Sequence, residues 1–386
     1  MLEMGDMEVQ NCECYSDSIY LFVEKKREIQ LCPVCGALTD KIHDYRIQLV
    51  RDIPVQGKSV YWKYRKRRYH CECCGKHFYE KCPLLPKYHQ ITNRVAFFAL
   101  DELSRKQSRK DIAERLNVSE TSMTRYLQLQ DFGRPDVLPK VISIDEFRGN
   151  TEFGRFQGII TDPVHHCIVD ILPTNDERDL YEYFRSFPNR DKVRFFVSDM
   201  KKEYVSMAKH LFPNAEIVID RFHVIRYACF ALEKVRQRVQ KKLPDGTRKF
   251  FKNSRLLLLK HKDHLKPSSR LKVAKMLEIC SELADAYLLK EKMYSFMDSG
   301  DYTEAKTRLS EFMCFAAVAG IPEFEACTTM LTNWAPFILN AFKCPYSNGF
   351  TEGCNNTIKV IKRTGYGYRN FKNFRTRILL VTNRKR

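Results

Sequence analysis

The spacing of hydrophobic and polar positions predicts a mixed sheet between residues 141 and 225. The short apolar runs "VISIDEF", "GRFQGIITD" and "HHCIVDILP" predict three strands joined as hairpins. The runs "VRFFVSDM" and "AEIVIDRFHV" predict two buried strands, each preceded by a stretch with helical periodicity. Strands joined through helices run parallel, whereas strands joined by tight turns run antiparallel. The pattern therefore predicts a five-stranded mixed sheet of the ribonuclease H type.

Helical periodicity dominates the chain after this sheet. From about Arg226 to Phe342 it is rich in Leu, Lys, Arg and Glu and has few helix breakers, which predicts a helical insertion. The segment "NGFTEGCNNTIKVIKR" then predicts one more helix with an apolar stripe of Phe350, Cys354, Ile358 and Ile361. Its opposite face carries one acid and several amides and bases: Glu352, Asn355, Asn356, Lys359 and Arg363.

Two cysteine motifs near the amino terminus predict a zinc ribbon. "CPVCG" and "CECCG" offer the thiolates of Cys32, Cys35, Cys71 and Cys74 to one structural Zn²⁺, and each glycine permits a tight turn. Cys73 could replace Cys71 or Cys74, and further ligands could come from Cys12, Cys14 and Cys82. The alternative is a set of unconnected buried cysteines. Between the motifs, "VYWKYRKRRYH" predicts a strand whose Arg67 and Arg68 contact phosphates or simply face solvent.

Residues 91–130 predict short helices that suit DNA binding. Ser108 can cap the helix "RKDIAERL" and Ser119 can cap "ETSMTRYLQL", with a turn of about three residues between them. This spacing is typical of a helix-turn-helix, although a plain helical hairpin would look similar. The second helix would present Ser122, Thr124 and Arg125 to the major groove. The stretch "DFGRPDVLPK" predicts a linker after it.

The composition indicates a nucleic-acid partner. The chain has 386 residues, with 66 Lys and Arg against 47 Asp and Glu, giving a net charge of +19. Such an excess favours a polyanion, and double-stranded DNA is the expected partner. Fifteen cysteines without a secretory signal indicate reduced thiols, and no apolar run suffices to span a membrane. We therefore expect a cytoplasmic protein associated with the bacterial nucleoid.

Three acids fall where a ribonuclease H sheet would bring them together. Asp145 lies on the first strand, Asp199 ends the fourth, and Glu352 starts the last helix. Each acid alone is weakly specific, since a carboxylate at a strand end is usually a turn residue. Together they form a set of hard oxygen ligands for Mg²⁺ or Mn²⁺, which can assist phosphodiester cleavage. DNA backbone contacts are expected beside them, from Lys359, Lys362 and Arg363.

The order of these motifs resembles the DDE transposases of bacterial insertion sequences, specifically the ISL-three family. The matching stretches include "CPVCG", "RRYHCECCGKHF", "ISIDEF", "VSDMKKEY", "FPNAEIVIDRFHVIR" and "NGFTEGCNNTIKVIKRTGYGYRNFKNF". The resemblance implies a catalytic triad of Asp145, Asp199 and Glu352. It implies binding to the inverted-repeat ends of an element and to target DNA, as a homodimer or higher oligomer. Asp220 and His223 match a family block, which implies an accessory role near the site.

These observations predict a multidomain α+β protein. The expected parts are a zinc-ribbon DNA-binding domain over residues 1–90, a helix-turn-helix over 91–131, and a ribonuclease H-like catalytic domain over 132–386 with its insertion at about 226–342. Two other functions stay open. A zinc and helix-turn-helix regulator would bind DNA without cutting it, and a nuclease of the same fold would hydrolyse DNA without joining ends.

Overall fold

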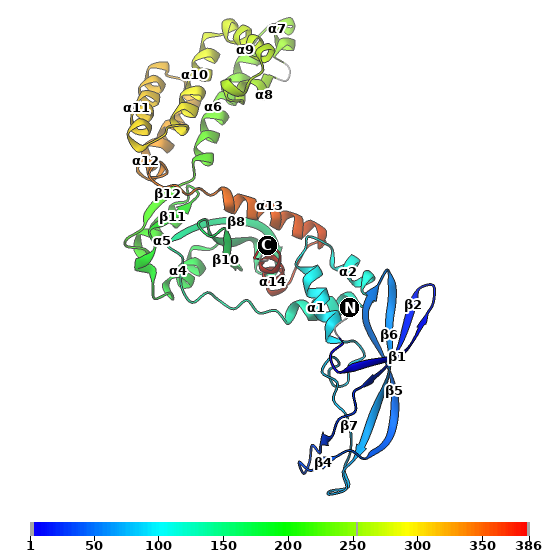
Figure 1. Cartoon of the computed structure of the whole chain (residues 1–386). Coiled ribbons are helices and arrows are strands. Elements are labelled where there is room, and N and C mark those ends of the chain that lie inside the picture. Colours follow the sequence, from blue (N-terminus) through cyan, green and yellow to red (C-terminus); the bar gives the residue numbers. More distant parts are fainter. Residues whose placement is uncertain (1–3, 252–253, 384–386) are drawn as a thin grey trace. The chain divides into compact units, whose positions relative to one another are not determined.

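The computed structural model describes residues 4–251 and 254–383, apart from the side chain of Phe222 (Figure 1). The chain forms two compact units. One comprises residues 134–356, and the other joins residues 1–133 to 357–386. The predicted catalytic domain spans residues 132–386, and its boundaries stay a prediction.

The unit of residues 134–356 is built on a five-stranded mixed sheet. Its strands are β8 (Val141–Thr151), β9 (Gly154–Asp162), β10 (Cys167–Leu172), β11 (Phe195–Ser198) and β12 (Glu216–Ile219). They are arranged in the order β10-β9-β8-β11-β12. The first three form an antiparallel meander, and β11 runs parallel to both β8 and β12. The predicted meander and parallel strands are therefore confirmed.

Two amphipathic helices, α4 (Glu177–Arg185) and α5 (Lys202–Leu211), make the parallel connections. The side chains of Leu180 and Phe184 on α4 are fully buried. The ring of Phe184 meets that of Phe212 edge to face at 5.3 Å between centroids. Phe196 of β11 stacks on Phe212 at 5.5 Å. These contacts hold β11, the strand that Asp199 directly follows, against the two helices.

The predicted helical insertion is present after β12. It contains α6 (Arg221–Lys242), α7 (Asp245–Phe250), α8 (Ser254–Leu259), α9 (Pro267–Ile279), α10 (Ser281–Met297), α11 (Tyr302–Ala319) and α12 (Glu325–Asn340). One hydrophobic cluster runs from the sheet into these helices. The amide of Asn340 donates a hydrogen bond of 2.9 Å to the carbonyl of Ile217 in β12. The insertion and the sheet therefore share one core.

The amino-terminal unit begins with a second sheet. Its strands are β1 (Met7–Cys14), β2 (Ser18–Lys25), β6 (Lys58–His70) and β5 (Ile42–Val55), in that order, with β7 (His77–Tyr79) also paired to β6. A small hairpin of β3 (Gln30–Leu31) and β4 (Leu38–Thr39) precedes β5. The stretch "VYWKYRKRRYH" lies in β6, where Trp62 and Tyr64 alternate inward and are fully buried.

Three short helices follow: α1 (Asn93–Leu103), α2 (Arg109–Arg115) and α3 (Glu120–Gln128). The predicted caps form, because Ser108 Oγ accepts from the amide of Asp111 and Ser119 Oγ accepts from that of Ser122. The carboxyl-terminal α14 (Phe371–Thr382) completes this helical group. Its Arg377 is 1% exposed and donates to the carbonyls of Arg105 and Gln107.

Candidate metal centres and nucleic-acid interface

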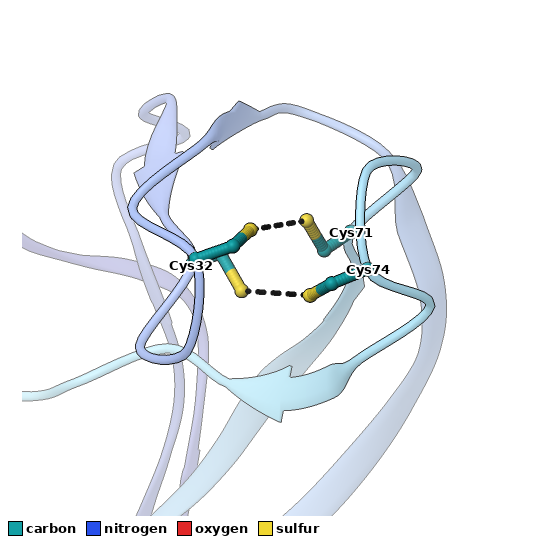
Figure 2. Close-up of side chains that lie close together, drawn as sticks. Cys32, Cys71 and Cys74 are labelled. Carbon is teal, nitrogen blue, oxygen red and sulfur yellow. Dashed lines mark hydrogen bonds between the residues drawn. The ribbon is translucent and has the colours of Figure 1, made fainter.

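Four cysteine sulfurs gather in the amino-terminal unit. Cys32 Sγ lies 3.5 Å from Cys74 Sγ, and Cys35 Sγ lies 3.5 Å from Cys71 Sγ. All four sulfurs are within 4.8 Å of one another, and Figure 2 shows the two facing pairs. Sulfurs held by one tetrahedral Zn²⁺ at about 2.3 Å would lie about 3.8 Å apart, so the cluster fits structural zinc.

The local backbone explains how each knuckle points its sulfurs inward. Gly36 donates to the carbonyl of Cys32, and Gly75 donates to that of Cys71. Both glycines have positive φ, +72° and +69°, which side chains rarely adopt. The backbone amide of Cys35 is the main cause that lowers the pKa of Cys32 to about 6, which favours the thiolate that zinc binds.

The alternative cysteine ligands lie outside this four-sulfur group. Within the described residues, the four-cysteine group contains neither Cys73 nor the cysteines at 12, 14 and 82. Cys82 is buried and donates to the sulfur of Met7 at 3.7 Å. Cys12 and Cys14 have their sulfurs 3.7 Å apart on the exposed strand β1. The Cys-x-x-Cys-Gly frame therefore selects the ligand set.

Asp145 and Asp199 come to the same region through strand register. Val197 of β11 pairs with Ser143 of β8, and each aspartate lies two residues further along its chain. Because side chains alternate across a sheet with a period of two, both aspartates leave the sheet on the same side. Asp145 Oδ1 accepts from the backbone amide of Glu146 at 2.7 Å. Asp199 directly follows the last residue of β11.

A buried set of hydroxyls fixes the start of α13 (Gly349–Thr364) over the sheet. Thr351 Oγ1 lies 2.7 Å from Thr161 Oγ1 of β9 and donates to Ser143 Oγ of β8 at 3.0 Å. Ser143 Oγ in turn donates to Asn348 Oδ1 at 2.5 Å. All four residues are fully buried. Glu352, the next residue after Thr351, is therefore held at a defined place.

Two carboxyl groups of the site, Asp145 and Asp199, have raised pKa values. Burial, followed by the charge of Asp199, raises the pKa of Asp145 to about 6. Burial also raises the pKa of Asp199, while His223 opposes this shift. His223 Nε2 lies 3.0 Å from Asp199 Oδ1. The amide of Asn355, one turn along α13 from Glu352, donates to Asp145 Oδ2 at 2.8 Å.

Glu352 lies beside the two predicted accessory residues. Ligand atoms of Asp220, His223 and Glu352 are within 4.8 Å of one another. Asp220 precedes α6 and is buried, and His223 lies in the first turn of that helix. In the part of the chain that the structure describes, the three predicted triad acids do not themselves form such a group. His223 belongs to this group and also contacts Asp199, so it links Asp199 to Asp220 and Glu352.

Several residues that lie at the site were not predicted from the sequence as members of it. Lys201 forms an ion pair with Glu146, and Asn175 donates to the same carboxylate. Asn355 was placed on the polar face of its helix, three residues after Glu352. That spacing was the available signal for its contact with the site. No comparable signal marked Glu146 and Lys201, which are distant in sequence.

The predicted DNA contacts differ in their surroundings. Arg67 is 7% exposed and its guanidinium pairs with Glu24 and Glu80, which disfavours the predicted phosphate contact. Two acids distant in sequence enclose it. Arg68 is partly exposed and pairs with Asp44. Of the remaining predicted contacts, three are exposed and three are half-buried: Arg125, Lys359 and Arg363, and Ser122, Thr124 and Lys362.

Comparison with known proteins first gives the class. Residues 142–378, more than half of the chain, match a family model described as "Transposase". Residues 28–74 match the zinc-finger of the transposases of IS204, IS1001, IS1096 and IS1165. The chain therefore belongs to the ISL-three (ISL3) family of transposases, with an amino-terminal zinc ribbon.

Similar proteins support this assignment to different extents. The chain is 26% identical over 366 residues to the transposase for insertion sequence element IS1001 of Bordetella parapertussis, covering 92% of this chain and 90% of that protein. It is 43% identical to an ATP-dependent protease of Lactococcus lactis over 61 residues, which is 16% of this chain. A match this short gives no information about the activity of the whole chain. Among the described residues, no helix combines the length and apolar character of a membrane span.

Proposed function

We propose that the protein binds the ends of an insertion sequence and catalyses metal-dependent DNA cleavage and strand transfer. The observation that carries this proposal is the placement of Asp145 and Asp199 on one side of neighbouring strands, with Glu352 held over the sheet by buried hydroxyls. The order of the five strands supports a ribonuclease H-like catalytic domain. Membership of a transposase family supports DNA as the substrate.

The acids fit Mg²⁺ or Mn²⁺, which we propose they bind. Carboxylate oxygens are the preferred ligands of these hard cations. The raised pKa of Asp145 reflects crowded negative charge that a cation would relieve. Asp199 Oδ1 is buried and accepts no well-aligned hydrogen bond from the described residues. When bound, the cations would activate the attacking hydroxyl and neutralise charge on the phosphate.

The chain's own residues orient the site. Asn355 donates to Asp145 Oδ2 and leaves the other oxygen bonded to a backbone amide, which fixes the carboxylate plane. His223 lies between Asp199 and Glu352, so we assign it and Asp220 an accessory role in holding these acids or the DNA. His223 can also donate a proton to an oxygen of the substrate when its imidazole is protonated.

We assign sequence recognition to the amino-terminal unit. The pair α2 and α3 has the short turn of a helix-turn-helix, and Arg125 is exposed near the middle of α3. Arg125 would read a base edge, while Lys359, Lys362 and Arg363 would contact phosphates. We further propose that the protein acts as a homodimer or higher oligomer on inverted-repeat ends and target DNA, in the cytoplasm on nucleoid DNA.

The test is cleavage of DNA carrying the sequences that flank the gene. Asp145→Asn, Asp199→Asn and Glu352→Gln should each abolish Mg²⁺-dependent nicking and end joining while leaving DNA binding intact. Glu203→Gln, an exposed acid on α5, is the control and should cleave normally. Normal cleavage by one of the three variants would remove that residue from the triad. Hydrolysis without joined products would instead identify a nuclease, and binding without cleavage a regulator.

A further inference from the structure

A cleft of about 620 Å³ opens beside the carboxylate cluster, within the unit of residues 134–356. Asp199, Met200 and Lys201 line the end of the cleft at the sheet. One side of α6 forms its long wall, and α8 contributes Arg255 and Leu259. The cleft therefore starts at a proposed metal ligand and extends away from it along a helix.

The wall of α6 carries exposed aromatic rings. His223, Tyr227 and Phe230 follow one another at intervals of four and three residues, which places them on one face of the helix. Tyr227 is 40% exposed and Phe230 is 63% exposed. On the opposite face of α6, Val224, Ala228 and Leu232 are buried in the core. The opposite face of α6 therefore packs the core, and Tyr227 and Phe230 stay partly exposed along the cleft, with Lys234 Nζ 4.6 Å from the centroid of the Phe230 ring.

The charges in the cleft favour an anion. Arg226 and Arg255 are both exposed, and both line the cleft. Glu233, an acid on the α6 wall, is buried and bonded to Arg236 and Gln237, and its Oε1 lies 3.9 Å from Arg255 Nε. Its negative charge is compensated mainly by Arg236, and Arg255 is close enough to share it. An aromatic wall flanked by arginines is the combination that binds single-stranded nucleic acid.

We propose that this cleft binds one unpaired nucleotide of the DNA strand that is cut, with its base against Phe230 and Tyr227. Arg226 and Arg255 would contact the flanking phosphates. The inference rests on the proposed function, because a phosphate held at Asp199 and His223 places the neighbouring nucleotide along α6. The cleft volume lies within the range of about 300–1,000 Å³ for small-ligand pockets, so it suits a nucleotide and not a duplex.

Binding in this cleft requires the base to leave the helical stack. A base inside a duplex cannot reach a wall of this kind, so the nucleotide must be extruded or already unpaired. Stacking on an aromatic ring repays part of the lost stacking energy, and it does so for any base. The cleft would therefore add little sequence preference of its own. Its effect would be to hold the strand so that the adjacent phosphate stays at the acids.

The experiment places 2-aminopurine at each position around the cleavage point of end DNA. This base analogue fluoresces when it is unstacked and is quenched when stacked in a duplex. The full-length Asp145→Asn protein, which should bind without cutting, is mixed with each duplex in Mg²⁺. We expect one position next to the cleaved phosphate to change its fluorescence severalfold, and Phe230→Ala in this background to abolish the change. Phe230→Trp should retain a large response.

Controls separate this inference from the proposed function. Phe153→Ala removes another exposed phenylalanine, 56% exposed in the turn between β8 and β9, and should leave the response intact. In the cleavage-competent protein, Phe230→Ala should reduce end cleavage about 5- to 150-fold, which corresponds to the stacking of one base. If the wild type cleaves but no position responds, or Phe230→Ala behaves like Phe153→Ala, the cleft is not a nucleotide site. If the wild type does not cleave, the proposed function fails and this inference falls with it.

Discussion

Replacing Asp145 with asparagine should stabilise the unit of residues 134–356 at neutral pH while destroying its proposed activity. Burial and the charge of Asp199 raise the pKa of Asp145 to about 6, from an ordinary value of about 3.9. Between these two values the folded chain keeps a proton that the unfolded chain has lost. Stability from this group therefore falls as the pH rises from about 4 to about 6, and the full penalty remains above that range.

The size of the effect follows from the shift. About two pH units at about 1.4 kcal/mol each give an upper limit near 3 kcal/mol at pH 7. Asparagine carries no charge and can still accept from the amide of Glu146, so the Asp145→Asn variant should escape this penalty. Its Nδ2 would replace the oxygen that accepts from Asn355, and the lost hydrogen bond should cost about 1 kcal/mol. The variant should therefore be about 1 kcal/mol less stable than wild type at pH 4 and about 1–2 kcal/mol more stable by pH 7.

Urea unfolding followed by amide hydrogen exchange is the suitable assay. Peptides from β8 and β11 report on this unit alone, which matters because a chain with two compact units need not unfold in one step. The buffer should lack Mg²⁺ and Mn²⁺ but also lack a strong chelator, so that the ribbon keeps its zinc. A stability difference that stays constant from pH 4 to pH 8 would refute the reasoning, as would a variant less stable than wild type at pH 7.

Three further predictions concern other parts of the chain. Cys74→Ser should lose the single tightly bound zinc and unfold the ribbon, because small metal domains depend on the ion for folding. Metal analysis and proteolysis of residues 28–74 would measure this, and zinc retained at one per chain would contradict it. Arg125→Ala should relax the sequence preference at one base pair by about 1–3 kcal/mol. Lys359→Ala should instead weaken binding to all DNA and flatten the salt dependence of binding. Binding measured across a salt series tests both variants, and the reverse result would exchange their roles. Thr351→Val should cost about 1–3 kcal/mol of unfolding free energy, because it leaves the buried hydroxyl of Thr161 without its partner. Adding Thr161→Val should recover part of that loss. Strictly additive losses would show that the two hydroxyls do not interact.

Local signals in the sequence were sufficient for much of this fold. The period-two and helical patterns predicted the five strands and the helical insertion, because alternation reflects which face a residue buries. Ser108 and Ser119 marked helix starts, since a hydroxyl there satisfies an amide that the helix leaves open. The spacing within "CPVCG" and "CECCG" selected the four clustered cysteines, because the turn of each knuckle is itself local.

Other features depended on residues far apart in the chain. Arg67 read as an exposed base in an alternating strand, but Glu24 and Glu80 enclose it, and neither acid is a neighbour in sequence. The nearness of Glu352 to Asp220 and His223 follows from how α13 and α6 are placed on the sheet, which a linear pattern cannot give. Whether the three predicted acids act as one triad stays a prediction.

The packing of α14 against helices α1, α2 and α3 has a consequence for how the chain folds during synthesis. Helices α1, α2 and α3 leave the ribosome early, yet Leu380 of α14 completes their hydrophobic cluster and Arg377 binds the carbonyls between α1 and α2. The cluster formed by α1, α2 and α3 is therefore complete only after α14 has been synthesised. A chain cut before α14 should then lose the proposed DNA recognition even with every proposed catalytic acid present. Truncated gene copies of this kind should consequently be poor competitors for the ends used by an intact copy.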